Sequence, residues 1–156
     1  MRSIQRIVLL VAVSICLPLT AKTAERQKVA QFSSYASVGL KQGKRYDFDV
    51  YQDDLNRTPA WQTNEELPPL SPRKAEAAAR RQLDKLVEHA ERWNRRIVAL
   101  HQMSDSDKWV YVVHFSGFHP PGVLDGAVPQ MRLVVLMDGR ALEPRVSPHR
   151  IGKTNR

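Results

Sequence analysis

The segment from 71 to 146 has the most regular pattern in the chain, and this pattern constrains the fold more than any other feature does. Ser71 is typical of a helix N-cap, and Pro72 suits the first helical position because its missing N–H needs no partner there. Apolar residues then recur at steps of three and four, at Ala75, Ala79, Leu83, Leu86, Ala90 and Trp93. We therefore expect one amphipathic helix of about 22 residues, roughly 33 Å long.

The opposite face of this helix carries bases and acids together. Glu76–Arg80 and Glu88–Arg92 have the i,i+4 spacing that favours ion pairs on a helix surface. A DNA-binding helix is the alternative interpretation, and the interleaved acids disfavour it. The chain has 24 basic and 16 acidic side chains, and the basic ones are spread along it. We expect an ordinary soluble surface and no nucleic-acid partner, with attraction to anionic envelope polymers or lipid head groups as the other interpretation.

Three apolar runs follow the helix. The runs at 97–103 and 109–115 flank a polar link, which predicts a β-hairpin. The third run, 131–137, reaches Asp138-Gly139, a strong turn signal, after which 140–146 returns as a weaker strand. These elements predict an α+β fold in which one long helix packs on an antiparallel meander of four to five strands.

The remaining segments set the domain boundaries. The segment 45–51 alternates, which predicts a half-buried strand before the helix. Its apolar side would carry Tyr46, Phe48 and Val50. We expect a single α+β domain at 45–146, preceded by a loosely held N-terminal arm at 25–44 that shows no sustained period. The polar, basic tail at 147–156 is predicted to be disordered.

The first residues have the layout of a secretory signal peptide, which we place at 1–24. Arg2 and Arg6 precede an apolar run at 7–17, and Pro18, Ala21 and Ala24 follow it. A spanning helix needs roughly 20 apolar residues, so the run is short for a membrane anchor. We expect cleavage after Ala21 or Ala24, no stable membrane span afterwards, and a periplasmic or secreted protein.

Cys16 is the only cysteine, and it lies inside the apolar run. A lipoprotein signal would need a small residue before the cysteine, and Ile15 is not small. Cleavage after Ala21 or Ala24 would leave a mature chain without cysteine, which excludes a disulfide framework. Its stability must then come from an apolar core.

The order of strand, long helix and antiparallel meander resembles the cystatin-like fold. The stretches 71–75 (SPRKA), 109–112 (WVYV) and 132–139 (RLVVLMDG) are also similar to PepSY-like domains of exported bacterial proteins. This resemblance covers roughly half of the chain. It implies a helix packed on a strand meander and a role in restraining peptidases at the cell envelope. Cystatins inhibit papain-type enzymes through a Gln-x-Val-x-Gly hairpin, whereas the hairpin link 104–108 has no glycine, so we assign no inhibitory residues.

The sequence has no catalytic or metal-binding motif. HExxH, CxxC, GxSxG, P-loop and GxGxxG patterns are all absent. The five histidines are His89, His101, His114, His119 and His149, and they are not clustered. We assign no catalytic residue, no metal ligand and no cofactor.

The hairpin register decides which side chains share a face. If Met103 lies opposite Trp109, Tyr111 lies opposite His101. His114 then points to the other face, and the two histidines cannot share a ligand. Both faces of this hairpin are largely apolar, and one helix covers only one of them. The cover of the second face is then the N-terminal arm, the long loop, a second copy or another partner.

The link 116–130 is long for a connection inside a compact domain. Phe118, Val123 and Leu124 give it apolar anchors, and His119 opens its Pro-rich part. We interpret the link as a lid on the open sheet face, with the N-terminal arm sharing that task. The alternative is a recognition loop.

Together these patterns favour a non-catalytic exported binding module. Its candidate binding residues are Phe118, His119, Val123, Leu124, His101 and Tyr111. The alternative function is a small ligand carrier or enzyme whose cup lies between helix and sheet and uses His101 and Tyr111. The expected partner is an unknown envelope protein, or a second copy bound through the second sheet face.

Overall fold

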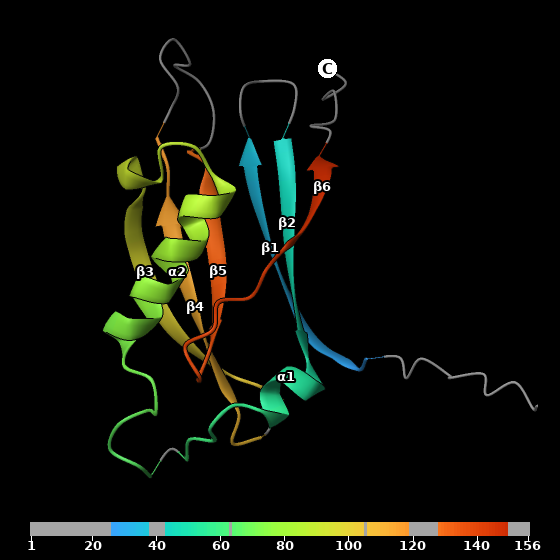
Figure 1. Cartoon of the computed structure of the whole chain (residues 1–156), viewed down its shortest axis with the longest axis vertical. Coiled ribbons are helices and arrows are strands. Elements are labelled where there is room, and N and C mark those ends of the chain that lie inside the picture. The colour runs from blue at the N-terminus through green and yellow to red at the C-terminus, as the bar shows by residue number, and fades with distance from the viewer. Residues whose placement is uncertain (1–25, 38–42, 63, 105, 119–127, 150–156) are drawn as a thin grey trace, which may run out of the picture.

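The computed structural model describes residues 26–37, 43–62, 64–104, 106–118 and 128–149 (Figure 1). The predicted signal peptide at 1–24 lies outside these ranges. The strands are β1 (Lys28–Ser37), β2 (Gly43–Tyr51), β3 (Asn94–Gln102), β4 (Trp109–Ser116), β5 (Gln130–Leu136) and β6 (Arg145–His149). The helices are α1 (Gln52–Asn56), α2 (Pro72–Leu86) and the 3-10 turn η1 (Ala90–Arg92).

The strands form one open antiparallel sheet in the order β3-β4-β5-β1-β2-β6. The predicted α+β class is confirmed, and the sheet has six strands rather than four to five. Figure 1 shows α2 lying across β4 and β5, while β1, β2 and β6 form the other half of the sheet. The sheet is therefore larger than one helix can cover.

Helix α2 begins where the sequence predicts. Ser71 Oγ accepts a hydrogen bond from the Lys74 N–H at 3.4 Å, and Pro72 is the first helical residue. The buried face carries Ala75, Ala78, Ala79, Gln82 and Leu83. Leu86 is only partly buried. The stripe and the N-cap are confirmed.

The predicted continuation of this helix to Trp93 is wrong. His89 has a left-handed backbone with φ 54°, which no α-helix accommodates, and a short 3-10 turn follows it. Arg80 holds the chain there, because its guanidinium donates to the carbonyls of Ala90 at 3.2 Å and Trp93 at 2.7 Å. The predicted pair Glu76–Arg80 is replaced by Glu76–Arg95 at 3.2 Å.

The prediction of a loosely held arm at 25–44 is wrong for residues 28–37, which form strand β1. It pairs with β2 along nearly its whole length, whereas it meets β5 only at Tyr35 opposite Gln130. The sequence of β1 mixes small, polar and aromatic residues without a clear period of two, so its strand character depends on pairing with β2. Strand β6 likewise corrects the prediction of disorder for 147–149, because it pairs with β2; the residues after 149 lie outside the described ranges.

The turn at Asp138-Gly139 is confirmed. Gly139 has φ +86°, a conformation that favours glycine, and the Arg140 N–H donates to Asp138 Oδ1 at 2.9 Å. The weak strand predicted for 140–146 pairs with β5 only through one bridge, between Val135 and Ala141. The chain then leaves β5, and β6 joins β2 on the far side of the sheet.

The predicted register of the β3–β4 hairpin is wrong by one residue. Gln102, not Met103, lies opposite Trp109, because Met103 belongs to the turn and its N–H donates to the Lys108 carbonyl at 2.8 Å. His101 therefore lies opposite Val110, and Leu100 lies opposite Tyr111. A one-residue slip exchanges the faces of a whole strand.

Both faces of β4 and β5 are buried, as the apolar runs predict. Helix α2 covers the face of Phe115, because the Arg80 guanidinium lies 4.5 Å from that ring centre. On the other face Phe32 of β1 meets His101 of β3, with ring centres 5.7 Å apart. Because these strands are three positions apart in the sheet, the sheet must curve strongly and carry β1 over the second face. Part of the predicted arm is thus the cover.

Candidate functional site

The structure separates His101 and Tyr111, the pair proposed for a cup. Tyr111 is 1% exposed, and its hydroxyl donates to the Leu70 carbonyl at 2.7 Å. His101 is exposed on the opposite face of the hairpin, against Phe32. The prediction that they share a face is wrong, because it depended on the register.

His101 and His114 lie on the same face, contrary to the prediction. His114 is opposite Ile97, four residues before His101 on β3. Burial lowers the pKa of His114, and the nearby charges of Arg132 and His101 lower it further. The described residues hold no group of three or more His, Cys, Asp or Glu side chains placed to bind a metal ion.

Only the ends of the link 116–130 are described. The Gly117 N–H donates to the Pro129 carbonyl at 2.8 Å, which closes the base of the link. The Arg92 guanidinium lies 3.6 Å from the ring centre of Phe118. The candidate residues His119, Val123 and Leu124 lie outside the described ranges, so the choice between lid and recognition loop remains a prediction.

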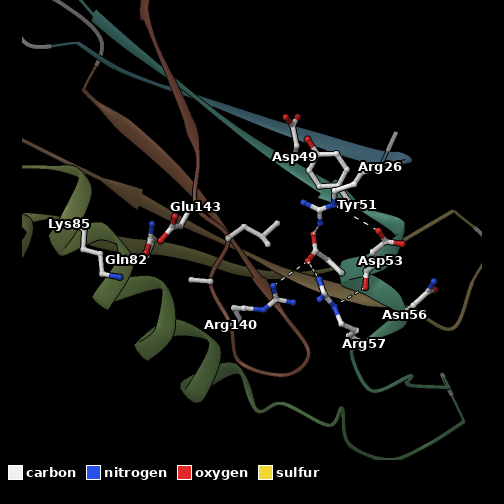
Figure 2. A pocket seen from close by; sticks show the side chains of 13 residues that line it. Arg26, Asp49, Tyr51, Asp53, Asn56, Arg57, Gln82, Lys85, Arg140 and Glu143 are labelled. Carbon is white, nitrogen blue, oxygen red and sulfur yellow. Dashed lines mark hydrogen bonds and ion pairs between the residues drawn. The ribbon is translucent and has the colours of Figure 1, made fainter. Parts of the chain in front are cut away.

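The described residues form an open hollow that no motif in the sequence predicts. It measures about 1040 Å³ and lies between α2, α1, the end of β2 and the connector 140–143; we call it the α2 hollow (Figure 2). Its basic lining residues are Arg26, Arg57, Lys85 and Arg140. Its acidic ones are Asp49, Asp53, Asp54 and Glu143. Bases and acids are thus equal in number, and the hollow has no net charge.

Asp54 organises the end of the hollow beside α1. It is 5% exposed and accepts hydrogen bonds from Arg26 at 2.8 Å, Arg57 at 2.9 Å and Arg140 at 3.2 Å. Burial acts to raise the pKa of Asp54, but the bonds from Arg140 and Arg57 and the charge of Arg26 outweigh it, so the pKa lies below its usual value. The Asp54 carboxylate thereby links three segments, which are the chain before β1, helix α1 and the connector 140–143.

Gln82 forms the other end of the hollow together with Lys85 and Glu143 (Figure 2). Gln82 is 6% exposed, and its amide has no hydrogen-bond partner among the described residues. Lys85 and Glu143 are exposed and likewise form no ion pair within the described ranges. This end therefore offers an amide, a cation and an anion that the described part of the chain leaves unused.

One signal for this site was present in the sequence. Gln82 follows Ala79 by three residues, so it occupies a position in the apolar stripe of α2. A polar residue at a core position calls for a specific partner. Arg57 follows Asp54 by three residues, whereas Arg26 and Arg140 gave no signal in the sequence, because they are 28 and 86 positions away from it.

Comparison with protein families, with characterised proteins and with solved structures finds no match to this chain. None of the helices in the described ranges has the length and apolar character that crossing a bilayer requires.

Proposed function

We propose that this protein is an exported, non-catalytic binding module and that the α2 hollow is its binding site. Gln82 carries this proposal. A polar group at the wall of a hollow that has no partner within the protein is left to hydrogen-bond water or a ligand there. Gln82 is 6% exposed and lines the open hollow, and its amide reaches that space without a hydrogen-bond partner among the described residues.

The proposed cellular location and the finer fold assignment rest on the sequence. The layout of residues 1–24 supports a signal peptide and a periplasmic or secreted mature protein. The Ser71-Pro72 helix start and the Asp138-Gly139 turn support a PepSY-like or cystatin-like arrangement within the α+β class. A protein partner in the cell envelope agrees with both the exported location and this fold assignment.

The chemistry of the hollow supports binding rather than catalysis. Proton transfer near neutral pH needs a group whose pKa lies near 7. Asp54 is held charged by three arginines, which moves its pKa away from that range. The alternative of a carrier or enzyme cup needs His101 and Tyr111 together, and their positions on opposite faces weigh against it.

Retention by the immobilised mature protein tests the proposal. Wild type, Gln82→Leu and Arg81→Ala would be exposed to an envelope extract, and the retained compounds identified by mass spectrometry. Leucine keeps the volume of Gln82 and removes its amide, whereas Arg81 is exposed on the same helix and serves as the control. We expect wild type and Arg81→Ala to retain the same compounds unchanged and Gln82→Leu to lose them. Equal retention by all three proteins, or chemical conversion of a retained compound, would overturn the proposal.

A further inference from the structure

We infer that the outer edge of β3 is a dimerisation surface, at which two copies of this chain pair their β3 strands antiparallel. Strand β3 is an edge of the six-stranded sheet, and β4 is its only strand neighbour (Figure 1). The backbone groups on its outer side have no hydrogen-bond partner among the described residues. Such an edge is a template for a further strand. The inference is separate from the proposed function, because β3 contributes no residue to the α2 hollow.

The alternation of hydrogen bonds along β3 determines which backbone groups point outward. The Met103 N–H donates to the Lys108 carbonyl at 2.8 Å, so these two residues face each other as a hydrogen-bonded pair. Hydrogen-bonded and non-hydrogen-bonded pairs alternate in an antiparallel ladder, and the register of β3 with β4 is regular from Ile97 onward. The N–H and carbonyl groups of Val98 and Leu100 therefore point away from β4.

The two edges of the sheet differ in how strongly they discourage pairing. Strand β6 has only five residues and includes Pro148, which has no backbone N–H to donate. Strand β3 has nine residues, and its segment 97–102 (IVALHQ) contains no proline and no Asp, Glu, Lys or Arg. The irregularity in its pairing with β4 lies before this segment, between Arg95 and Ile97. Short length, proline, charge and bulges are the usual protection of an edge, so the segment 97–102 is open to a second copy.

The segment 97–102 is complementary to itself in one antiparallel register. With Ala99 opposite Ala99 of the second copy, Val98 lies opposite Leu100, and their outward backbone groups form hydrogen-bonded pairs. Ala99 then belongs to a non-hydrogen-bonded pair, in which the Cα atoms are about 4.5 Å apart and small side chains fit. Ile97 lies opposite His101 in this register. Pairing therefore covers Ile97, which is 50% exposed in the single chain, and places no like charges opposite each other.

Cysteine cross-linking tests this register. The expected mature chain has no cysteine, since Cys16 precedes the cleavage sites, so each variant would carry one. In Ala99→Cys the paired Cα atoms lie within the range of roughly 4.4–6.8 Å that a disulfide spans. The control His101→Cys is on the same face of β3 and more exposed, but its two copies are about 13 Å apart in this register. Under mild oxidation Ala99→Cys should form a linked dimer at least about tenfold faster, because only its sulfur atoms come within bonding distance. Equal cross-linking of the two variants would overturn the inference.

Sedimentation velocity of the mature protein measures the association itself. An edge contact of this length buries less than the roughly 1,200–2,000 Å² of a standard interface, so wild type should shift from monomer to dimer only as its concentration rises. Val98→Pro removes an outward N–H without breaking the ladder with β4 and should stay monomeric, whereas the control Val98→Thr keeps that N–H and should dimerise.

A wild type that is monomeric at every concentration would overturn the inference. Hydrogen exchange identifies the occupant of the edge, because the amides of Val98 and Leu100 should be protected only where the dimer is populated. Protection of these amides in the monomer would also overturn the inference, since another segment of the same chain would then cover the edge.

Discussion

At the scale of single residues, Asp54 is notable because its buried carboxylate binds three arginines. Its side chain is buried, whereas the side chains of the three arginines that bind it are between 46% and 64% exposed. Because the arginine of each ion pair stays hydrated, the arrangement avoids much of the cost of burying both charges. The ion pairs of Asp54 hold α1 and the connector 140–143 in place, and these two segments form two walls of the α2 hollow.

Replacement of Asp54 by asparagine should therefore destabilise the protein. Breaking a buried ion pair costs about 3–5 kcal/mol, and the exposure of the arginines reduces the expected loss to about 1–3 kcal/mol. The neighbouring variant Asp53→Asn is the control, since Asp53 is exposed and its pair with Arg26 measures 3.9 Å. It should change the free energy of unfolding by less than about 0.5 kcal/mol. Urea melts at neutral pH that give equal losses for the two variants would contradict this account of Asp54.

Asp47 makes the stability of the folded protein depend on pH in the acid range. The Ser33 hydroxyl donates to it at 2.6 Å and Arg45 donates at 2.8 Å, and these bonds lower the pKa of Asp47 to about 2. In the unfolded chain an aspartate titrates near 3.9. The stabilisation from Asp47 is thus complete above about pH 4 and is lost as the pH falls from about 4 to about 2. Thermal melts across this range should show a shallower decline for Asp47→Asn than for wild type, and parallel declines would exclude the effect.

At the scale of elements, the bounds of α2 depend both on its local sequence and on contacts with residues outside the helix. Its start depends on Ser71 and Pro72, and its buried face follows from the apolar spacing, so both could be predicted. Its end depends on Arg80, whose hydrogen bonds reach Ala90 and Trp93 outside the helix. No periodicity encodes such a contact, and the apolar stripe continued past the true end of the helix.

Substitutions on α2 should distinguish its two faces. Leu83 is fully buried, so Leu83→Ala should cost roughly 2–5 kcal/mol of unfolding free energy. Leu86→Ala should cost less, because Leu86 is only partly buried. Arg81→Ala on the exposed face should change stability by less than about 0.5 kcal/mol. Denaturant melts in which Arg81→Ala and Leu83→Ala shift equally would refute the assignment of faces.

At the scale of the whole molecule, the sheet closes its own second face. The contact between Phe32 and His101 requires strong curvature, and β1 supplies the cover within the same chain. The need for a cover was predictable, because β4 is apolar on both faces. Its source was not, because β1 is recognisable only through its pairing with β2. The face assigned to a second copy is thus occupied at β4 and β5 by the chain itself.

The expected processing site agrees with this architecture. Cleavage after Ala21 or Ala24 would retain Arg26, which pairs with Asp54, and the whole of β1. The intact mass of the exported protein should place the mature N-terminus between residues 22 and 25. A retained Met1 or a lipid adduct on Cys16 would contradict the assignment of a cleaved signal peptide. So would an N-terminus beyond Arg26.

The most direct test of the central claim is an NMR titration of the isotope-labelled mature protein. Spectra would be compared with and without the envelope fraction that the immobilised protein retains. The account predicts that the side-chain amide of Gln82 and the backbone amide of Ala141 shift together and saturably. If the shifts are instead confined to the link 116–130 and Gln82 does not respond, the α2 hollow is not the binding site.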